Sequence, residues 1–308
     1  MAKENIIQER IDYKPVEDAL RYFIEESCDS STLFPALLSL SCEAVGGDHE
    51  DTIPTAAALI FVTGAVDIHD DIIDQSKFKG PKLTVFGKFG GDIALLVGDA
   101  LLLKGLKLLN EVNEHLPRKH RKKIIDLAKN SLFEIGFAEA KETSLRGRWD
   151  LSPEEYLEII REKAAITRAI AQIGAILGKG SEEEVRALGK YGRILGILST
   201  IRDDYIDIFE PEEVKNRAEN EVLPLPILYA FQNRMAKKKI LGIIGKERIE
   251  EGDTRRILEI ISETEGSEIF KEKLKYFYDR GEKALKNIKN TRISASLREV
   301  LRDITEGL

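Results

Sequence analysis

Two short segments of the sequence contain the same arrangement of acidic residues, Asp-Asp-x-x-Asp. They are Asp70, Asp71 and Asp74 within "VDIHDDIID" (66–74), and Asp203, Asp204 and Asp207 within "IRDDYIDIFE" (201–210). On a helix, residues three or four positions apart lie on the same face, so each segment directs at least two carboxylates the same way. Both segments are otherwise rich in apolar residues, so the negative charge falls where burial is expected.

This arrangement is costly unless a cation accompanies it. Neighbouring carboxylates repel each other, and an apolar setting adds a desolvation penalty. Mg²⁺ offsets both costs, because it prefers oxygen ligands and commonly bridges one or two carboxylates to a substrate phosphate. A single such motif also occurs on ordinary solvated helices, but two copies in apolar surroundings favour the metal. The sequence therefore predicts Mg²⁺ that holds a diphosphate, with an apolar substrate tail alongside.

The rest of the chain shows the periodicity of helices. In the segment 152–177, apolar residues recur about every three to four positions. The segment begins with Ser152, Pro153 and two glutamates, which is typical of a capped helix N-terminus. Strand signals are almost absent, because no apolar and polar residues alternate over a sustained run and no Asn-Gly turn occurs. We therefore predict an all-α fold.

Short segments with turn or loop signals separate the predicted helices, and 209–213 is one of them. No long linker rich in Pro, Gly or Ser divides the chain. A length of 308 residues suits one large domain or two of ordinary size. We predict a single helical domain over residues 1–308.

Composition limits the classes of partner. The net charge of −7 argues against nucleic acid, since phosphate binding needs clustered Lys and Arg. No run reaches the roughly 18 uninterrupted apolar residues of a membrane span, and the first residues lack the apolar stretch of a signal peptide. The two cysteines, Cys28 and Cys42, make no disulfide framework and fit a reducing compartment. We expect a cytoplasmic protein without a membrane span.

Several segments between about residues 28 and 230 resemble one family. They are "IHDDIID" (68–74), "LTVFGKFGGDIALLVGDALL" (83–102), "EYLEIIREKAAITRAIAQIGAIL" (155–177), "YGRILGILSTIRDDYIDIF" (191–209) and "LPLPILYA" (223–230). The sequence is similar to the trans-polyprenyl diphosphate synthases, which include farnesyl and geranylgeranyl diphosphate synthases. The resemblance implies an all-α fold of the isoprenoid synthase type around a deep central cavity, usually as a homodimer. It also implies that Mg²⁺ helps to ionise an allylic diphosphate, whose carbocation then reacts with isopentenyl diphosphate.

The resemblance also implies roles for particular residues. The metal ligands would be Asp70, Asp71, Asp74, Asp203, Asp204 and Asp207. Asp70, Asp71 and Asp203 would be catalytic together with Lys163, and both Lys79 and Lys163 would contact the allylic diphosphate. Ala65 and Phe61 would line the pocket for the prenyl chain, although both positions also fit ordinary helix packing.

The sequence departs from the family mainly where isopentenyl diphosphate binds. Ser31, Thr32 and Phe34 stand where the family has Lys, Arg and Arg, and Gly80 stands where it has a second Arg. The first of those two later positions keeps a cation, Lys79. The loop after the second acidic motif is shortened and leaves Lys215 or Arg217 as substitutes for the usual lysine. The residues expected to bind metal are therefore all present, whereas the basic residues expected to bind isopentenyl diphosphate are replaced.

Three functions are compatible with this pattern. The first is a Mg²⁺-dependent prenyltransferase that binds and ionises an allylic prenyl diphosphate. The second is a non-catalytic or modified subunit that pairs with a related synthase in a heteromer. The third is an enzyme that uses an acceptor other than isopentenyl diphosphate, by cyclisation or another transfer. The presence of all six aspartates favours retained ionisation chemistry, whereas product chain length and acceptor stay open.

Overall fold

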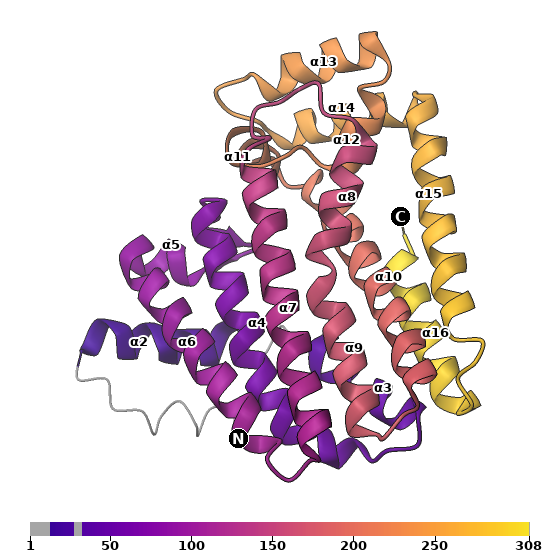
Figure 1. Cartoon of the computed structure of the whole chain (residues 1–308). Coiled ribbons are helices and arrows are strands. Elements are labelled where there is room, and N and C mark those ends of the chain that lie inside the picture. Colours follow the sequence, from indigo (N-terminus) through magenta and orange to yellow (C-terminus); the bar gives the residue numbers. More distant parts are fainter. Residues whose placement is uncertain (1–12, 28–32, 308) are drawn as a thin grey trace. The chain divides into compact units, whose positions relative to one another are not determined.

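The computed structural model describes residues 13–27 and 33–307 of the chain (Figure 1). Helices form most of this part. Its strands are two short segments, β1 (Phe78–Lys79) and β2 (Lys82–Leu83), which pair in antiparallel fashion. Gly80 lies between them with a φ of 58°, a conformation that glycine adopts at little cost. The prediction of an all-α fold is confirmed.

The chain forms two compact units. The first unit comprises residues up to 131 together with 169–189 and 288–293. The second unit comprises residues 132–168, 190–287 and 294–308. Four of the five unit boundaries fall within helices, namely α7 (Arg118–Thr143), α9 (Ala165–Leu177), α10 (Glu182–Asp207) and α16 (Thr291–Thr305), and the fifth lies between residues 287 and 288. The single domain over residues 1–308 stays a prediction.

The first unit contains the first acidic motif. Its other elements are α2 (Lys14–Tyr22), the π-helical turn η1 (Phe23–Ser27), α3 (Leu33–Ala44), the 3₁₀ turn η2 (His49–Thr52), α4 (Ile53–Ile73), α5 (Val85–Phe89) and α6 (Gly91–Val112). Helices α4 and α6 run side by side (Figure 1). Glycines on α6 allow this close approach: a Cβ on Gly98 would lie 2.5 Å from His69 Nε2, and one on Gly105 would lie 2.8 Å from Val62 Cγ2. This packing holds the end of α4, where the motif lies, against a long partner.

The second unit contains the second acidic motif, at the end of α10. Its other helices are α8 (Pro153–Lys163), α11 (Pro211–Asn220), α12 (Leu225–Ala230), α13 (Arg234–Ile244), α14 (Glu251–Ser262) and α15 (Glu265–Ala284). Helix α12 is buried along its whole length. It packs closely on α15, because a Cβ on Gly266 would lie 2.5 Å from the carbonyl oxygen of Tyr229. The segment after the second motif is thereby fixed to the core of this unit.

Local sequence signals account for the start of α8. The Ser152 hydroxyl accepts a hydrogen bond from the Glu155 N–H at 3.2 Å, and Glu155 Oε2 accepts one from the Ser152 N–H at 3.1 Å. This reciprocal pair is a capping box, and Pro153 occupies the first turn. The helix start predicted from these residues is confirmed.

The segment after the second acidic motif differs from expectation. The sequence predicts a turn or loop at 209–213; residues 209 and 210 form that break, but the helix α11 begins at Pro211 and continues to Asn220. Proline suits the first turn of a helix because it lacks only an N–H that would have no partner there. Glu212 and Glu213 in the first turn and Arg217 in the last turn match the helix dipole. The turn signals therefore mark a short break at 209–210, and the residues from Pro211 on start a helix.

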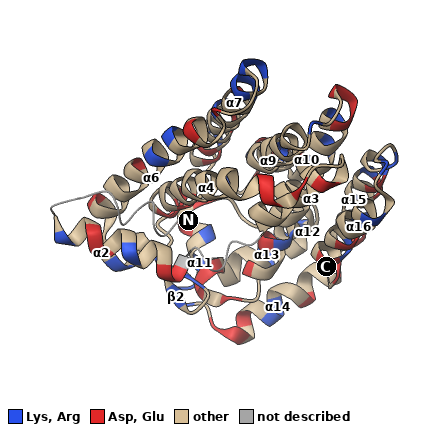
Figure 2. Cartoon of the chain, turned by 90° about the horizontal axis from the view of Figure 1, so that it is seen from below, with Lys and Arg blue, Asp and Glu red and all other residues tan. Residues whose placement is uncertain are grey.

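The described surface carries charges of both signs. Along α14, acidic and basic residues are interspersed (Figure 2). Arg255 lies 3.1 Å from Glu251, and Arg256 lies 2.6 Å from Glu259, each on the exposed side of this helix. Such exposed pairs contribute little to stability, because water and salt screen them. No helix among the described residues combines the length and apolar character required to cross a membrane.

Candidate functional site

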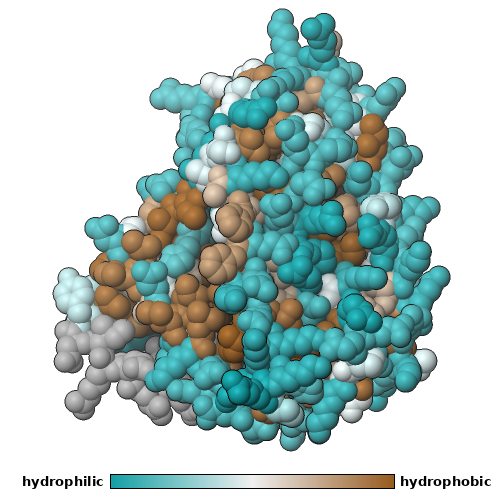
Figure 3. All heavy atoms as spheres, viewed as in Figure 1, coloured by the Kyte–Doolittle hydropathy of each residue, from teal (hydrophilic) through white to brown (hydrophobic). Residues whose placement is uncertain are grey.

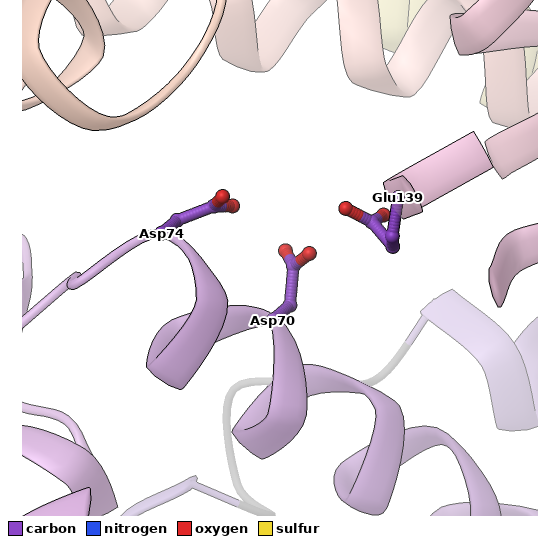
Figure 4. Close-up of side chains that lie close together, drawn as sticks. All are labelled: Asp70, Asp74 and Glu139. Carbon is purple, nitrogen blue, oxygen red and sulfur yellow. The ribbon is translucent and has the colours of Figure 1, made fainter. Parts of the chain in front are cut away.

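The first acidic motif lies at the C-terminal end of α4. Asp70 is in the last turn, Asp74 caps the helix, and their carboxylates point to the same side (Figure 4). One oxygen of Asp70 and one of Asp74 lie within 4.8 Å of each other. The C-terminal end of a helix carries partial negative charge, so two carboxylates there need a compensating cation.

The surroundings of Asp70 fit a metal ion. Its Oδ1 atom is buried and has no hydrogen-bond partner among the described residues. A buried carboxylate oxygen without a partner is costly, because it has lost its water and gained nothing. A divalent cation that takes oxygen ligands would satisfy it. The donor set at the end of α4 therefore suits Mg²⁺.

Asp71 points elsewhere and pairs with a cation of the protein itself. Lys79 on β1 places its Nζ atom 3.0 Å from Asp71 Oδ1 and 2.5 Å from Asp67 Oδ1. Burial raises the pKa of Asp71 to about 7, although Lys79 lowers it. Desolvation lowers the pKa of Lys79, but Asp67 and Asp71 together raise it above its ordinary value. The structure thus places Lys79 beside the first motif as a partner of Asp71 and of Asp67, which lies one turn before it on the same helix.

In the second motif, Asp204 is fully buried and held at both oxygens. Its Oδ1 atom accepts a hydrogen bond from the Tyr156 hydroxyl at 3.1 Å and lies 3.1 Å from Arg217 Nη2. Its Oδ2 atom accepts a hydrogen bond from the Leu225 N–H at 3.0 Å. Burial raises the pKa of Asp204 to about 7, although Arg217 lowers it. Asp203, by contrast, is exposed.

Arg217 on α11 connects most of the second motif. Its Nη2 atom lies 2.6 Å from Asp207 Oδ2, and its Nε atom lies 3.2 Å from Glu221 Oε2. Its Nη1 atom donates to the Tyr156 hydroxyl at 3.2 Å. The sequence offers Arg217 only as a substitute for a missing lysine. Its position in the structure is that of a buried counter-ion for three carboxylates.

Lys163 ends α8 and pairs with two acidic residues of α7. Its Nζ atom lies 2.5 Å from Glu142 Oε2 and 3.0 Å from Glu139 Oε1. Glu142 is buried. The sequence gives no signal that these two glutamates pair with Lys163, because both lie in a helix with many charged residues. The two carboxylates fix the position of the ammonium group.

The predicted chain-length positions lie in the interior of α4. Ala65 and Phe61 are both wholly buried. Phe61 faces α6, because a Cβ added to Gly105 would lie 3.0 Å from the Cβ of Phe61. This contact is ordinary helix packing, which the sequence also allows. The role of both residues in binding a prenyl chain stays a prediction.

The four positions without the family's basic residues divide into two groups. Ser31 and Thr32 lie outside the described residues. Phe34 lines a cavity of about 440 Å³ in the first unit, to which Asp67, Asp71 and Lys79 also contribute. Gly80 forms the hairpin turn, where its positive φ would strain an arginine.

The sequence is similar to known proteins. A family-wide sequence model described as polyprenyl synthetase matches residues 16–261. A geranylgeranyl diphosphate synthase of Methanosarcina mazei is 32% identical over 234 residues, which cover 74% of this chain and 70% of that protein. A short chain isoprenyl diphosphate synthase of Methanothermobacter thermautotrophicus is 31% identical over 237 residues, which cover 74% and 70%.

The fold is similar to a solved structure. Geranylgeranyl pyrophosphate synthetase from Pyrococcus horikoshii aligns with a TM-score of 0.85 at 23% sequence identity, and the alignment covers 99% of this chain and 93% of that one. It shows the same all-α isoprenoid synthase fold. The resemblance seen in the aspartate motifs is thereby confirmed over most of the chain. The chain therefore belongs to the polyprenyl synthetase family of prenyltransferases.

Proposed function

We propose that this chain is a Mg²⁺-dependent prenyltransferase that binds an allylic prenyl diphosphate through its two acidic motifs and ionises it. The buried oxygen of Asp70 without a hydrogen-bond partner carries this proposal, because it requires a cation. The names of the relatives, geranylgeranyl and short chain isoprenyl diphosphate synthases, support a prenyl diphosphate as the substrate.

The six aspartates divide into two roles in this proposal. Asp70, Asp74 and Asp203 would contribute most directly to holding Mg²⁺. Asp71, Asp204 and Asp207 each pair with an internal cation, so they would orient their neighbours as well as add negative charge. Mg²⁺, when bound, stabilises the negative charge that develops on the departing diphosphate. Lys163 would add a positive charge to the same group, with Glu139 and Glu142 fixing its position.

The first experiment measures melting temperature with Mg²⁺ and geranyl diphosphate, separately and together. Ligand that binds only the native state stabilises it, so metal and diphosphate together should raise the melting temperature more than either alone. Release of pyrophosphate should accompany incubation with both. Asp70→Asn should abolish the combined shift, whereas Asp92→Asn, a change to an exposed acidic residue in the first turn of α6, should not. An equal shift in the presence of EDTA would contradict the proposal.

We also propose that the chain assembles as a homodimer. Leucines on α6 are exposed, with Leu95 at 49%, Leu96 at 54% and Leu103 at 71%. Figure 3 shows hydrophobic residues gathered over this helix. Exposed apolar groups of this size are typical of surfaces that a partner covers. A heteromer with a related synthase is the alternative, and the cytoplasmic location stays a prediction.

A further inference from the structure

The cavity of the first unit differs in character from the carboxylates at the end of α4. It has a volume of about 440 Å³, and most of its lining is apolar. The apolar side chains come from η1, α3, α4, β2 and the start of α5, and they are Phe23, Phe34, Ile60, Ile68, Leu83 and Val85. Small-molecule sites are commonly lined in this way, with a few polar groups at defined positions.

The charged residues of the lining are already paired with one another. Lys79 lies 2.5 Å from Asp67 and 3.0 Å from Asp71, and Lys82 lies 3.2 Å from Glu26. Among the described residues, the lining of the cavity therefore has two ammonium groups and three carboxylates. An entering anion would meet a surplus of negative charge and would have to compete for both lysines.

The hydroxyl groups of the lining have internal partners too. Thr84 Oγ1 donates to the Ser76 carbonyl at 2.8 Å and accepts from the Gly87 N–H at 2.9 Å. Thr63 Oγ1 donates to the Ile60 carbonyl at 3.4 Å. A diphosphate gains much of its affinity from charge-assisted hydrogen bonds with unpaired donors, and the side-chain donors that the described residues bring to this lining are engaged. A hydrocarbon group, by contrast, gains free energy here simply by leaving water.

We propose that this cavity binds the acceptor of the prenyl group, and that the acceptor is an uncharged, largely apolar molecule with a carbon–carbon double bond or an aromatic ring. The proposal rests on the proposed function, because an acceptor requires an allylic donor. Phe34 gives the cavity an aromatic side chain where the family resemblance leads one to expect an arginine. The sequence change and the apolar lining therefore point to the same class of ligand.

The transfer to such an acceptor balances without any further reactant. The bond between C1 and oxygen of the allylic diphosphate breaks, and diphosphate leaves with the electron pair. A π electron pair of the acceptor forms the new carbon–carbon bond to C1. The acceptor then loses one proton, which the released diphosphate accepts.

A matched pair of ligands tests the class of acceptor. 3-Methyl-3-buten-1-ol and isopentenyl diphosphate share one hydrocarbon group and differ in the charged head. Saturation-transfer NMR, without Mg²⁺ or allylic diphosphate, should show binding of the alcohol to the full-length chain. The dissociation constant for isopentenyl diphosphate should be no lower than that for the alcohol. Tighter binding of the diphosphate, or no binding of either ligand, would overturn the proposal.

Two substitutions locate the binding in the cavity. Ile60→Trp should fill it and abolish the signal of the alcohol, whereas Ile53→Trp, on the same helix but exposed, should leave the signal unchanged. Phe34→Arg should lower the dissociation constant for isopentenyl diphosphate by about tenfold or more, the gain of one charged hydrogen bond. Met235→Arg adds the same charge on α13 and should have no such effect. Equal responses of variant and control would overturn the proposal.

The same preparation separates this proposal from the proposed function. Stabilisation by Mg²⁺ with geranyl diphosphate reports on the acidic motifs, and the alcohol is measured without either of them. If Mg²⁺ with geranyl diphosphate does not stabilise the chain but the alcohol still binds, the allylic chemistry is excluded and the cavity remains a site for an apolar ligand. The reverse result would leave the prenyltransferase and exclude an uncharged acceptor in this cavity.

Discussion

At the scale of single residues, the aspartates of each acidic motif differ in burial and in pairing, which their spacing does not reveal. In each motif the second aspartate is the most deeply buried, and a cation of the protein pairs with it. Asp71 pairs with Lys79, and Asp204 pairs with Arg217. Burial raises the pKa of each aspartate to about 7. The motifs are therefore part of the internal structure as well as a place for metal.

Replacement of Arg217 tests how much the internal cation stabilises the second motif. Arg217→Gln would leave Asp204, Asp207 and Glu221 close together without a counter-ion. Removal of one partner from a buried ion pair costs about 3–5 kcal/mol, so the free energy of unfolding should fall by that order. Denaturant unfolding in EDTA measures it directly.

Two further variants interpret this measurement. Arg217→Lys keeps the charge but loses the planar fork, so it should recover only part of the stability. Lys215→Gln, on the same helix, removes a cation that lies 3.0 Å from the exposed Glu219. This control should cost less than about 1 kcal/mol. Equal losses for Arg217→Gln and Lys215→Gln would mean that Arg217 has no special role.

At the scale of elements, α11 shows what short-range sequence signals miss. The capping residues of α8 lie within three positions of one another, and the sequence predicts that helix start correctly. The six aspartates are also visible from their spacing alone. The partners of Asp204 are not, because Tyr156 lies 48 positions before it and Leu225 lies 21 after it. Such contacts depend on how helices pack, which local periodicity does not specify.

The position of α11 beside the second motif predicts a pH dependence. Burial, followed by repulsion from Asp207 and Glu221, raises the pKa of Glu213 on α11 to about 7 from an ordinary value of 4.5. The folded state therefore holds this proton more tightly than the unfolded state does. The resulting stability is present below about pH 4.5 and is lost as the pH rises towards about 7.

Glu213→Gln should remove this part of the pH dependence. Between about pH 5 and pH 7 in EDTA, the wild-type chain should lose more stability than the variant, by roughly 1–2 kcal/mol. Glu212→Gln, its exposed neighbour, should follow the wild type. Parallel pH profiles of wild type and Glu213→Gln would show that the carboxyl group of Glu213 titrates normally in the folded chain.

At the scale of the whole molecule, the exposed apolar residues require an explanation beyond a single chain. Leu103 on α6 is 71% exposed, and Phe133 and Phe137 on α7 are 63% and 70% exposed. Large hydrophobic groups gathered on one surface are typical of sites that a partner covers. In a two-fold symmetric dimer each such residue is buried twice, so its contribution to assembly is doubled. A homodimer is thus the simplest assembly that covers α6.

Leu103→Lys tests this assembly. Burial of a leucine contributes about 1.5–3 kcal/mol, and two copies contribute about twice that. The variant should therefore dissociate with a constant at least about a hundredfold higher than that of the wild-type dimer, as sedimentation equilibrium would show. Arg255→Ala changes an exposed residue of α14, a helix of the second unit, that lies 3.1 Å from Glu251 and should leave the dimer intact. A wild-type chain that sediments as a monomer, and becomes a dimer only with a related synthase, would replace the homodimer by a heteromer.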